Sequence, residues 1–156
     1  NMYDNSLKVP AIIKWPGVTS AGMVIEENML SLDWYPTVVD MAGAQLPEEQ
    51  PIRGRSLVPL LKDEQVSWDN NIYAEYSMIN YSQSYMRTYR TPEWKLTLDF
   101  KDPGRHELYH LSEDPAENHN LINSQSEEVR TVIRTLTDKI HEKMTEINDP
   151  LLKGNY

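Results

Sequence analysis

The sequence predicts an α+β fold in which a small antiparallel sheet of about four strands packs against a long C-terminal helix. Short segments rich in β-branched and aromatic residues follow one another between residues 72 and 111, with only tight turns between them. Such spacing is typical of antiparallel pairing. Residues 124–148 then carry one apolar stripe at helical spacing. This stripe needs a partner, and the sheet is its nearest candidate.

The first 43 residues have a different character, which is typical of α/β proteins. Residues 9–15 are short and apolar, and three consecutive apolar residues at 11–13 predict a strand that is buried on both faces. Residues 30–42 place apolar side chains at helical spacing and end at Gly43, which predicts a helix. One strand and one helix are too few to stand alone, so we expect residues 1–43 to belong to a larger sheet.

The remaining elements follow from turn residues and periodicity. Residues 44–71 contain several prolines and many polar residues, which predicts a connecting loop with one short turn around residues 57–61. Residues 72–156 then form the C-terminal subdomain. Its four predicted strands are residues 72–76, 85–90, 94–100 and 107–111. The segment 94–100 gives the clearest signal, because apolar and polar residues alternate along it.

The C-terminal helix has a start and a stop signal. Ser124 and Glu127 have the spacing of a capping box, so we expect the helix to begin beside Ser124. Asp149 and Pro150 predict its end, since the residue before a proline avoids the helical conformation.

Composition narrows the classes of function. The chain of 156 residues carries 15 Lys and Arg against 24 Asp and Glu, a net charge of −9, which argues against a nucleic-acid partner. It contains no cysteine, so disulfides, thiolate catalysis and Cys-ligated metals are excluded. No apolar run approaches the roughly 20 residues that span a bilayer. Residues 1–4 carry no basic segment, so we expect no signal peptide here.

No catalytic or metal centre is visible in the residues themselves. The four histidines do not form a His-x-x-x-His pair on a predicted helix. The pairs at residues 4–5 and 69–70 are Asp-Asn, but two oxygens are too few for calcium, which takes six to eight. The chain has neither a Gly-x-Ser-x-Gly turn nor a glycine-rich phosphate loop. We therefore expect no catalytic residue and no metal ligand in this chain.

The segment 77–85 is polar and rich in tyrosine. This composition suits contacts with a sugar or an aryl group, because an aromatic face stacks and a hydroxyl hydrogen-bonds, although an ordinary loop has the same composition. Nearby cations could face an anionic substrate, but strand cations also protect sheet edges, and we favour that structural role. The candidate substrate-rim residues are Asn80, Tyr81, Gln83, Tyr85, Arg87 and Arg90.

Six segments, taken in order, resemble the C-terminal part of the sulfatase family, which belongs to the alkaline-phosphatase-like superfamily. The first carries Tyr3 and Asp4 and continues through Val-Pro to Trp-Pro-Gly, and the third reads Gly-Arg-Ser-Leu-Val-Pro-Leu-Leu. The segments are residues 2–17, 31–43, 54–61, 87–95, 107–109 and 114–121. Their common order over about 120 residues carries the resemblance more than any one of them does. One departure is His110, where the family often has Asp.

The resemblance implies a parent enzyme with an α/β fold that hydrolyses sulfate esters of sugars or aryl groups. Family members use a formylglycine made from Cys or Ser and a calcium ion held by Asp and Asn side chains. This sequence has no Cys and no Ser-x-Pro-Ser-Arg string, so we expect a fragment that lies downstream of the catalytic half and is inactive alone. Residues 1–43 would then supply the last strand and helix of the large domain. The C-terminal subdomain would shape the rim of the cleft.

Two other functions stay open. A relative in the same superfamily could cleave phosphate or phosphonate esters, or the chain could be a non-catalytic module that binds glycans. The resemblance implies a periplasmic, secreted or lysosomal location without selecting one. Because residues 9–15 would expose apolar faces in a fragment, we also expect the chain alone to self-associate or to be disordered near residues 1–20.

Overall fold

The computed structural model describes residues 1–154 and divides into two units. The first unit contains residues 1–9 together with the chain from residue 71 onward, and the second contains residues 10–70. The chain therefore leaves the first unit at Val9 and returns to it at Asn71.

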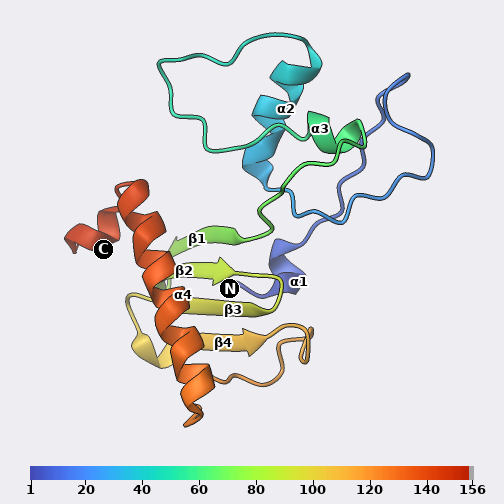
Figure 1. Ribbon diagram of the computed structural model, residues 1–156. Coiled ribbons are helices and arrows are strands. Elements are labelled where there is room, and N and C mark those ends of the chain that lie inside the picture. The colour runs from blue at the N-terminus through green and yellow to red at the C-terminus, as the bar shows by residue number, and fades with distance from the viewer. Residues whose placement is uncertain (155–156) are drawn as a thin grey trace. The chain divides into compact units, whose positions relative to one another are not determined.

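The first unit is built on a four-stranded antiparallel sheet in the order β1-β2-β3-β4 (Figure 1). This confirms the predicted sheet. The strands are β1 (Ile72–Ile79), β2 (Gln83–Arg90), β3 (Trp94–Asp99) and β4 (Glu107–His110). Tight turns join the first three, and a short 3₁₀ helix, η2 (Pro103–Arg105), lies between β3 and β4. Sequential neighbours pair because such short connections leave no room for a crossover.

Helix α4 (Glu127–Glu146) crosses one face of the sheet (Figure 1). Alternate strand residues point toward it, so Leu96 and Leu108 pack with Ile140 and are fully buried. The predicted capping box is wrong. The helix begins at Glu127 with Ser126 as its N-cap, and the Ser124 hydroxyl instead accepts from the Ser126 N–H at 3.2 Å.

The second face of the sheet is also buried. Thr88 and Thr97 are paired across β2 and β3 on this face, and their hydroxyl oxygens lie 2.8 Å apart. They are 0% and 1% exposed. The N-terminal segment, which includes α1 (Asp4–Leu7), contacts this face through Tyr3 and Asp4. The sheet is thus covered on both sides within its own unit.

The second unit is smaller and has few regular elements. It contains η1 (Ser31–Asp33), α2 (Trp34–Met41) and α3 (Val58–Leu61), in agreement with the helix and the short turn expected there. Gly43 ends α2 with a positive φ of 66°, a conformation that favours glycine. Gly54 lies so close to Leu32 that an added Cβ would sit 2.0 Å from its carbonyl oxygen. No larger residue fits there without a backbone shift.

The strand expected at residues 9–15 does not form. Ile13 and Trp15 pack against the small core around Leu57, Leu60 and Leu61. In contrast, Val9 and Ile12 are 81% and 90% exposed. No segment of the described residues pairs with this one, and a strand needs a partner for its backbone groups. Among residues 1–154, no helix is long and apolar enough to cross a membrane.

Candidate functional site

The turn between β1 and β2 presents three of the predicted rim residues to solvent. Asn80, Tyr81 and Gln83 are exposed, and the Tyr81 side chain is fully accessible. The Asn80 N–H donates to the Ser82 carbonyl at 3.1 Å, which closes the turn. Ile79 beside it is 70% exposed. We call residues 79–83 the hairpin tip. An aromatic ring flanked by two amides can stack on a sugar and hydrogen-bond its hydroxyls.

The other three predicted rim residues have internal partners. Tyr85 belongs to the core beneath α4. Arg87 is 3% exposed and forms a bidentate pair with Asp149, with Nε–Oδ2 and Nη2–Oδ1 distances of 2.5 and 3.1 Å. Arg90 pairs with Asp4 through its Nη2 at 3.1 Å. Arg87 and Arg90 lie on the inner strand β2 and pair with buried carboxylates, so their structural role is internal and differs from the protection of a sheet edge that we favoured.

The Arg87–Asp149 pair joins the sheet to the segment that follows α4. Asp149 also accepts the Leu151 N–H at 2.9 Å and so begins η3 (Pro150–Lys153). Burial by itself would raise the pKa of Asp149, but the hydrogen bonds from Arg87 and from the Leu151 N–H outweigh it and lower that pKa. Asp149 therefore stays ionised, which the buried Arg87 requires.

A second buried ion-pair cluster holds the N-terminal segment to the sheet. We call Asp4, Arg90, Lys95 and Glu117 the Asp4 cluster. The Lys95 ammonium lies 3.0 Å from Asp4 Oδ1 and also forms an ion pair with Glu117. Glu117 in turn accepts the backbone N–H of Asp4 at 2.6 Å. Two cations and two carboxylates balance one another here, so a buried charge is not left uncompensated.

The sheet and the turn after β4 explain why these residues meet. Arg90 and Lys95 are paired across β2 and β3, so both side chains leave the same face of the sheet. Glu117 has a positive φ of 57° and closes a turn by donating its N–H to the Asp114 carbonyl. Tyr3 completes the docking, because its hydroxyl donates to Glu107 at 3.0 Å.

Asp4 is held ionised by three cations. Burial would raise the pKa of Asp4, but hydrogen bonds from Lys8, Arg90 and Lys95 outweigh it, and the pKa lies well below its ordinary value. Lys8 is 64% exposed, so its part in this arrangement is screened by water. The two buried cations are the ones that fix the carboxylate in place.

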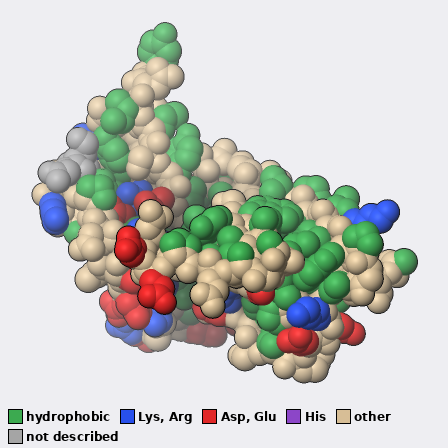
Figure 2. Space-filling model, turned by 90° about the horizontal axis from the view of Figure 1, so that it is seen from above, with side chains coloured by type: hydrophobic (Ala, Val, Ile, Leu, Met, Phe, Trp, Pro, Cys, Tyr) green, Lys and Arg blue, Asp and Glu red, His purple; other side chains and the backbone are tan. Residues whose placement is uncertain are grey.

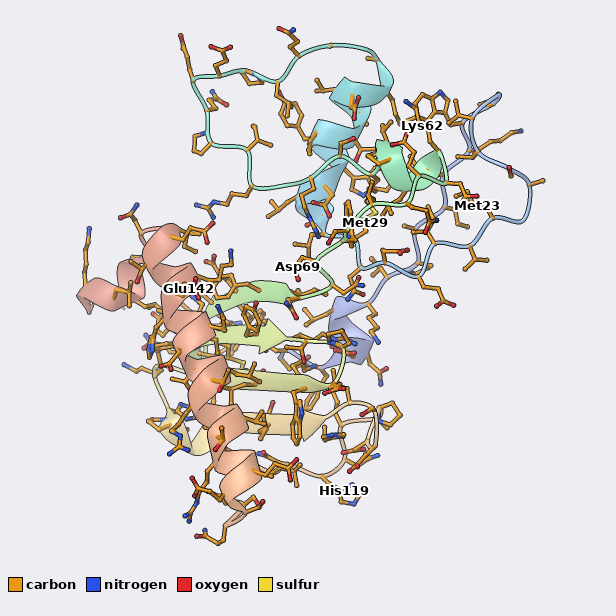
Figure 3. All side chains as sticks on the ribbon, viewed as in Figure 1. Met23, Met29, Lys62, Asp69, His119 and Glu142 are labelled. Atoms are coloured by element: carbon orange, nitrogen blue, oxygen red, sulfur yellow. The ribbon has the colours of Figure 1, made fainter. Side chains whose placement is uncertain are left out.

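The histidines do not form a catalytic or metal centre. His110 Nδ1 lies 3.2 Å from the Ser112 hydroxyl and 3.8 Å from a Glu113 carboxylate oxygen. Both partners use the same ring nitrogen, so the imidazole cannot relay a proton between them as a catalytic triad requires. His119 lies on the loop after β4 and is 82% exposed (Figure 3). Residues 1–154 contain no group of three His, Asp or Glu side chains that could hold a metal ion.

Sequence reasoning missed the Asp4 cluster, although a signal for it was present. Asp4, Lys95 and Glu117 each lie in one of the segments that carry the sulfatase resemblance. Arg87 and Glu107 do so as well. These five motif residues therefore connect parts of the first unit that lie far apart in the sequence.

The family model and the similar proteins all belong to one family. The family model described as "N-sulphoglucosamine sulphohydrolase, C-terminal" matches residues 1–146. Human steryl-sulfatase is 27% identical over 189 aligned residues, which cover 100% of this chain and 32% of that protein. The N-acetylglucosamine-6-O-sulfatase of Bacteroides thetaiotaomicron is 31% identical over 126 residues, covering 78% of this chain and 22% of that protein. The chain thus spans a third or less of the length of these relatives.

A solved structure shares the fold. It is a protein in complex with its substrate D-glucosamine-2-N,6-O-disulfate, and it superimposes with a TM-score of 0.76 at 27% identity. The match covers 89% of this chain and 29% of that one. The family match extends over both units and includes the segments that build the Asp4 cluster and the hairpin tip. The chain therefore belongs to the sulfatase family and corresponds to its C-terminal part.

Proposed function

We propose that this chain is the C-terminal part of an enzyme that hydrolyses sulfate esters of sugars, and that the hairpin tip lies at the rim of the substrate cleft. The family match over residues 1–146 carries the proposal. The descriptions of two similar proteins name sulfated amino sugars. One protein is an N-acetylglucosamine-6-O-sulfatase, and the other is in complex with a glucosamine disulfate. The description of the matching family model, which names N-sulphoglucosamine, supports the same substrate class.

The chemistry would take place outside this chain. A formylglycine nucleophile needs a Cys or Ser in the family motif, and this sequence has neither the Cys nor the Ser version of it. Residues 1–154 also lack a set of carboxylates that fits calcium. Calcium and the nucleophile would therefore belong to the other part of a longer sulfatase. The role of this chain is to bind and orient substrate.

The hairpin tip is suited to that role because its polar side chains are not engaged in hydrogen bonds with other described residues. No side-chain hydrogen bond among the described residues involves Asn80, Tyr81 or Gln83. The tip is also held firmly, since eight paired positions join β1 to β2. Because the pairing fixes the backbone, little backbone entropy is lost when the ring stacks on a sugar.

Residues 10–43 would meet the rest of such an enzyme. Hydrophobic side chains gather at the surface in the view of Figure 2. The most exposed large hydrophobic side chains of the second unit are those of Ile12, Val24, Leu32, Tyr35 and Val38. A sheet of the catalytic part would give residues 9–15 the backbone partners that they lack here, and α2 would pack on its face.

The test compares this chain with the longest polypeptide that its gene encodes. Glucosamine 6-sulfate, 4-nitrophenyl sulfate and 4-nitrophenyl phosphate are offered to both. We expect the chain alone to hydrolyse none of them and the longer polypeptide to hydrolyse the sulfated sugar. Preference for the phosphate would support the phosphatase alternative instead. Turnover by the chain alone, or tight binding of the sugar by the chain with no turnover by either form, would contradict the proposal.

A further inference from the structure

We infer that residues 2–8 form a strap, a segment that can leave the sheet while β1–β4 and α4 stay folded, and that Lys95 is the latch that keeps it docked. This inference goes beyond the proposed function, because it concerns how the first unit opens rather than what an enzyme acts on.

The strap is separable because the main core does not contain it. The hydrophobic cluster between the sheet and α4 includes Leu96, Leu108 and Ile140, and none of its members comes from residues 1–8. All four strands find their hydrogen-bond partners within residues 72–110. The strand ladder and the core between the sheet and α4 therefore do not need the strap, and its release uncovers the second face of the sheet, where Thr88 and Thr97 are buried.

The strap is held mainly by side chains. Its own backbone bonds stay inside it, since the Ser6 and Leu7 N–H groups donate to the Tyr3 carbonyl and the Lys8 N–H donates to the Asp4 carbonyl. Within residues 1–154, the Asp4 N–H is the one strap backbone group that bonds outside the strap, and its acceptor is the Glu117 carboxylate. Met2 is buried to 2% and adds apolar contact. A segment attached in this way can open locally, below the free energy of global unfolding.

Lys95 is the latch because it joins the strap to the sheet and to the turn after β4 at once. Its ammonium is 1% exposed and pairs with both Asp4 and Glu117. Removing it would leave Glu117 buried without a cation while Glu117 still accepts the Asp4 N–H. Releasing the strap exposes both carboxylates to water and relieves that cost. Arg90 still contacts Asp4 but not Glu117, so it cannot replace Lys95.

Release of the strap would change how the two units are connected. The chain passes from the strap into the second unit after Val9 and returns at Asn71. With the strap docked, both ends of residues 10–70 are attached to the first unit. With the strap released, the link at residues 9–10 starts from an undocked segment, whereas the link at residues 70–71 still starts from the folded sheet. The latch thus controls one of the two chain connections between the units.

Amide hydrogen exchange on the whole chain tests this inference, with Lys95→Met and Lys8→Met as a matched pair. Both variants remove an ammonium that contacts Asp4, but only Lys95 is buried. In Lys95→Met we expect the Asp4, Ser6, Leu7 and Lys8 amides to exchange about tenfold faster or more. Central α4 amides should stay strongly protected. In Lys8→Met the strap should exchange within about threefold of the native chain.

The inference is overturned if the amides of the strap and those of α4 exchange together. If strap and α4 amides exchange at the same rate in the native chain and in both variants, then residues 2–8 unfold only with the rest. If Lys95→Met fails to fold, Tyr3→Phe takes its place, because it removes the hydrogen bond to Glu107 without burying a charge. Faster exchange confined to the strap in Tyr3→Phe supports the inference, and equal acceleration in strap and α4 overturns it.

Discussion

The two units of the chain differ in how completely they bury their apolar side chains. In the first unit, α4 covers one face of the sheet, the N-terminal segment contacts the other, and the buried charges are paired. In the second unit, Val24 is 80% exposed and Val38 on α2 is 58% exposed. The first unit has what an independent domain needs. The second resembles part of an interface, as expected for a chain that spans about a third of its relatives.

The difference also concerns where charge is placed. The first unit buries Arg87, Lys95, Asp99 and Asp149 with almost no solvent exposure. Buried ion pairs are a weak source of net stability, but breaking one of them is costly, because the remaining charge has no partner. The first unit should therefore tolerate few substitutions of these buried charged residues, whereas the open surface of the second unit should tolerate many.

The largest effect is expected from breaking the Arg87–Asp149 pair. Arg87→Met leaves Asp149 buried without a cation and should lower the free energy of unfolding by about 3–5 kcal/mol. Arg134→Met is the control, since it removes a pair with Glu127 at 3.0 Å in an exposed position, and it should change stability by less than about 1 kcal/mol. Urea unfolding followed by circular dichroism measures both. Equal effects of the two substitutions would show that burial does not separate these pairs.

Acid should weaken the first unit through its buried carboxylates. The pKa values of Asp4 and Asp149 lie below their ordinary value in the folded chain. The unfolded chain takes up protons first, near pH 4, so the stability these groups supply is complete above about pH 5 and falls as pH decreases further. The urea midpoint should fall between pH 5 and pH 3.

Asp4→Asn identifies the part of this loss that comes from Asp4. The variant starts from a lower midpoint at pH 7 and should lose less on acidification than the native chain does. Parallel curves for the two proteins would mean that Asp4 does not contribute to the pH dependence.

The open surface of the second unit should cause self-association. Ile12→Lys puts a charge on the most exposed isoleucine of that unit and should weaken dimer formation by about tenfold, measured by light scattering over a concentration series. Ile79→Lys makes the same change at an exposed isoleucine of the first unit and should have little effect. The comparison between the units would fail if the two variants behaved alike, or if the native chain were monomeric at all concentrations.

Much of the first unit could be predicted from the sequence, because its signals are local. The alternation at residues 94–100 and the apolar stripe of residues 124–148 each belong to one element, and both elements form. The strand at residues 9–15 could not be judged in this way, since a strand depends on a partner and none lies among the described residues. The apolar run of residues 9–15 indicates that the segment is suited to burial, but it does not identify the partner that would bury it.

The site was harder to predict than the fold. Lys95 and Glu117 meet the N-terminal segment across sequence separations of 91 and 113 residues, and no local pattern reports such contacts. Cations on a strand likewise look the same in sequence whether they face a substrate or a buried carboxylate. For Arg87 and Arg90 we had weighed a substrate contact against the protection of a sheet edge, and neither pattern indicated the pairs with Asp149 and Asp4.

The smallest effect on stability, and the most direct test of the rim, is expected at the hairpin tip. Tyr81→Ala should change the free energy of unfolding by less than about 0.5 kcal/mol, because the side chain is fully accessible. In the longer polypeptide, loss of a stacking ring should raise KM for glucosamine 6-sulfate by about three- to tenfold with kcat nearly unchanged. Tyr81→Phe keeps the ring and should keep the native KM. If Tyr81→Ala keeps the native KM, the hairpin tip does not lie at the rim of the substrate cleft. If KM rises as much in Tyr81→Phe as in Tyr81→Ala, the contact is made by the hydroxyl and not by the ring.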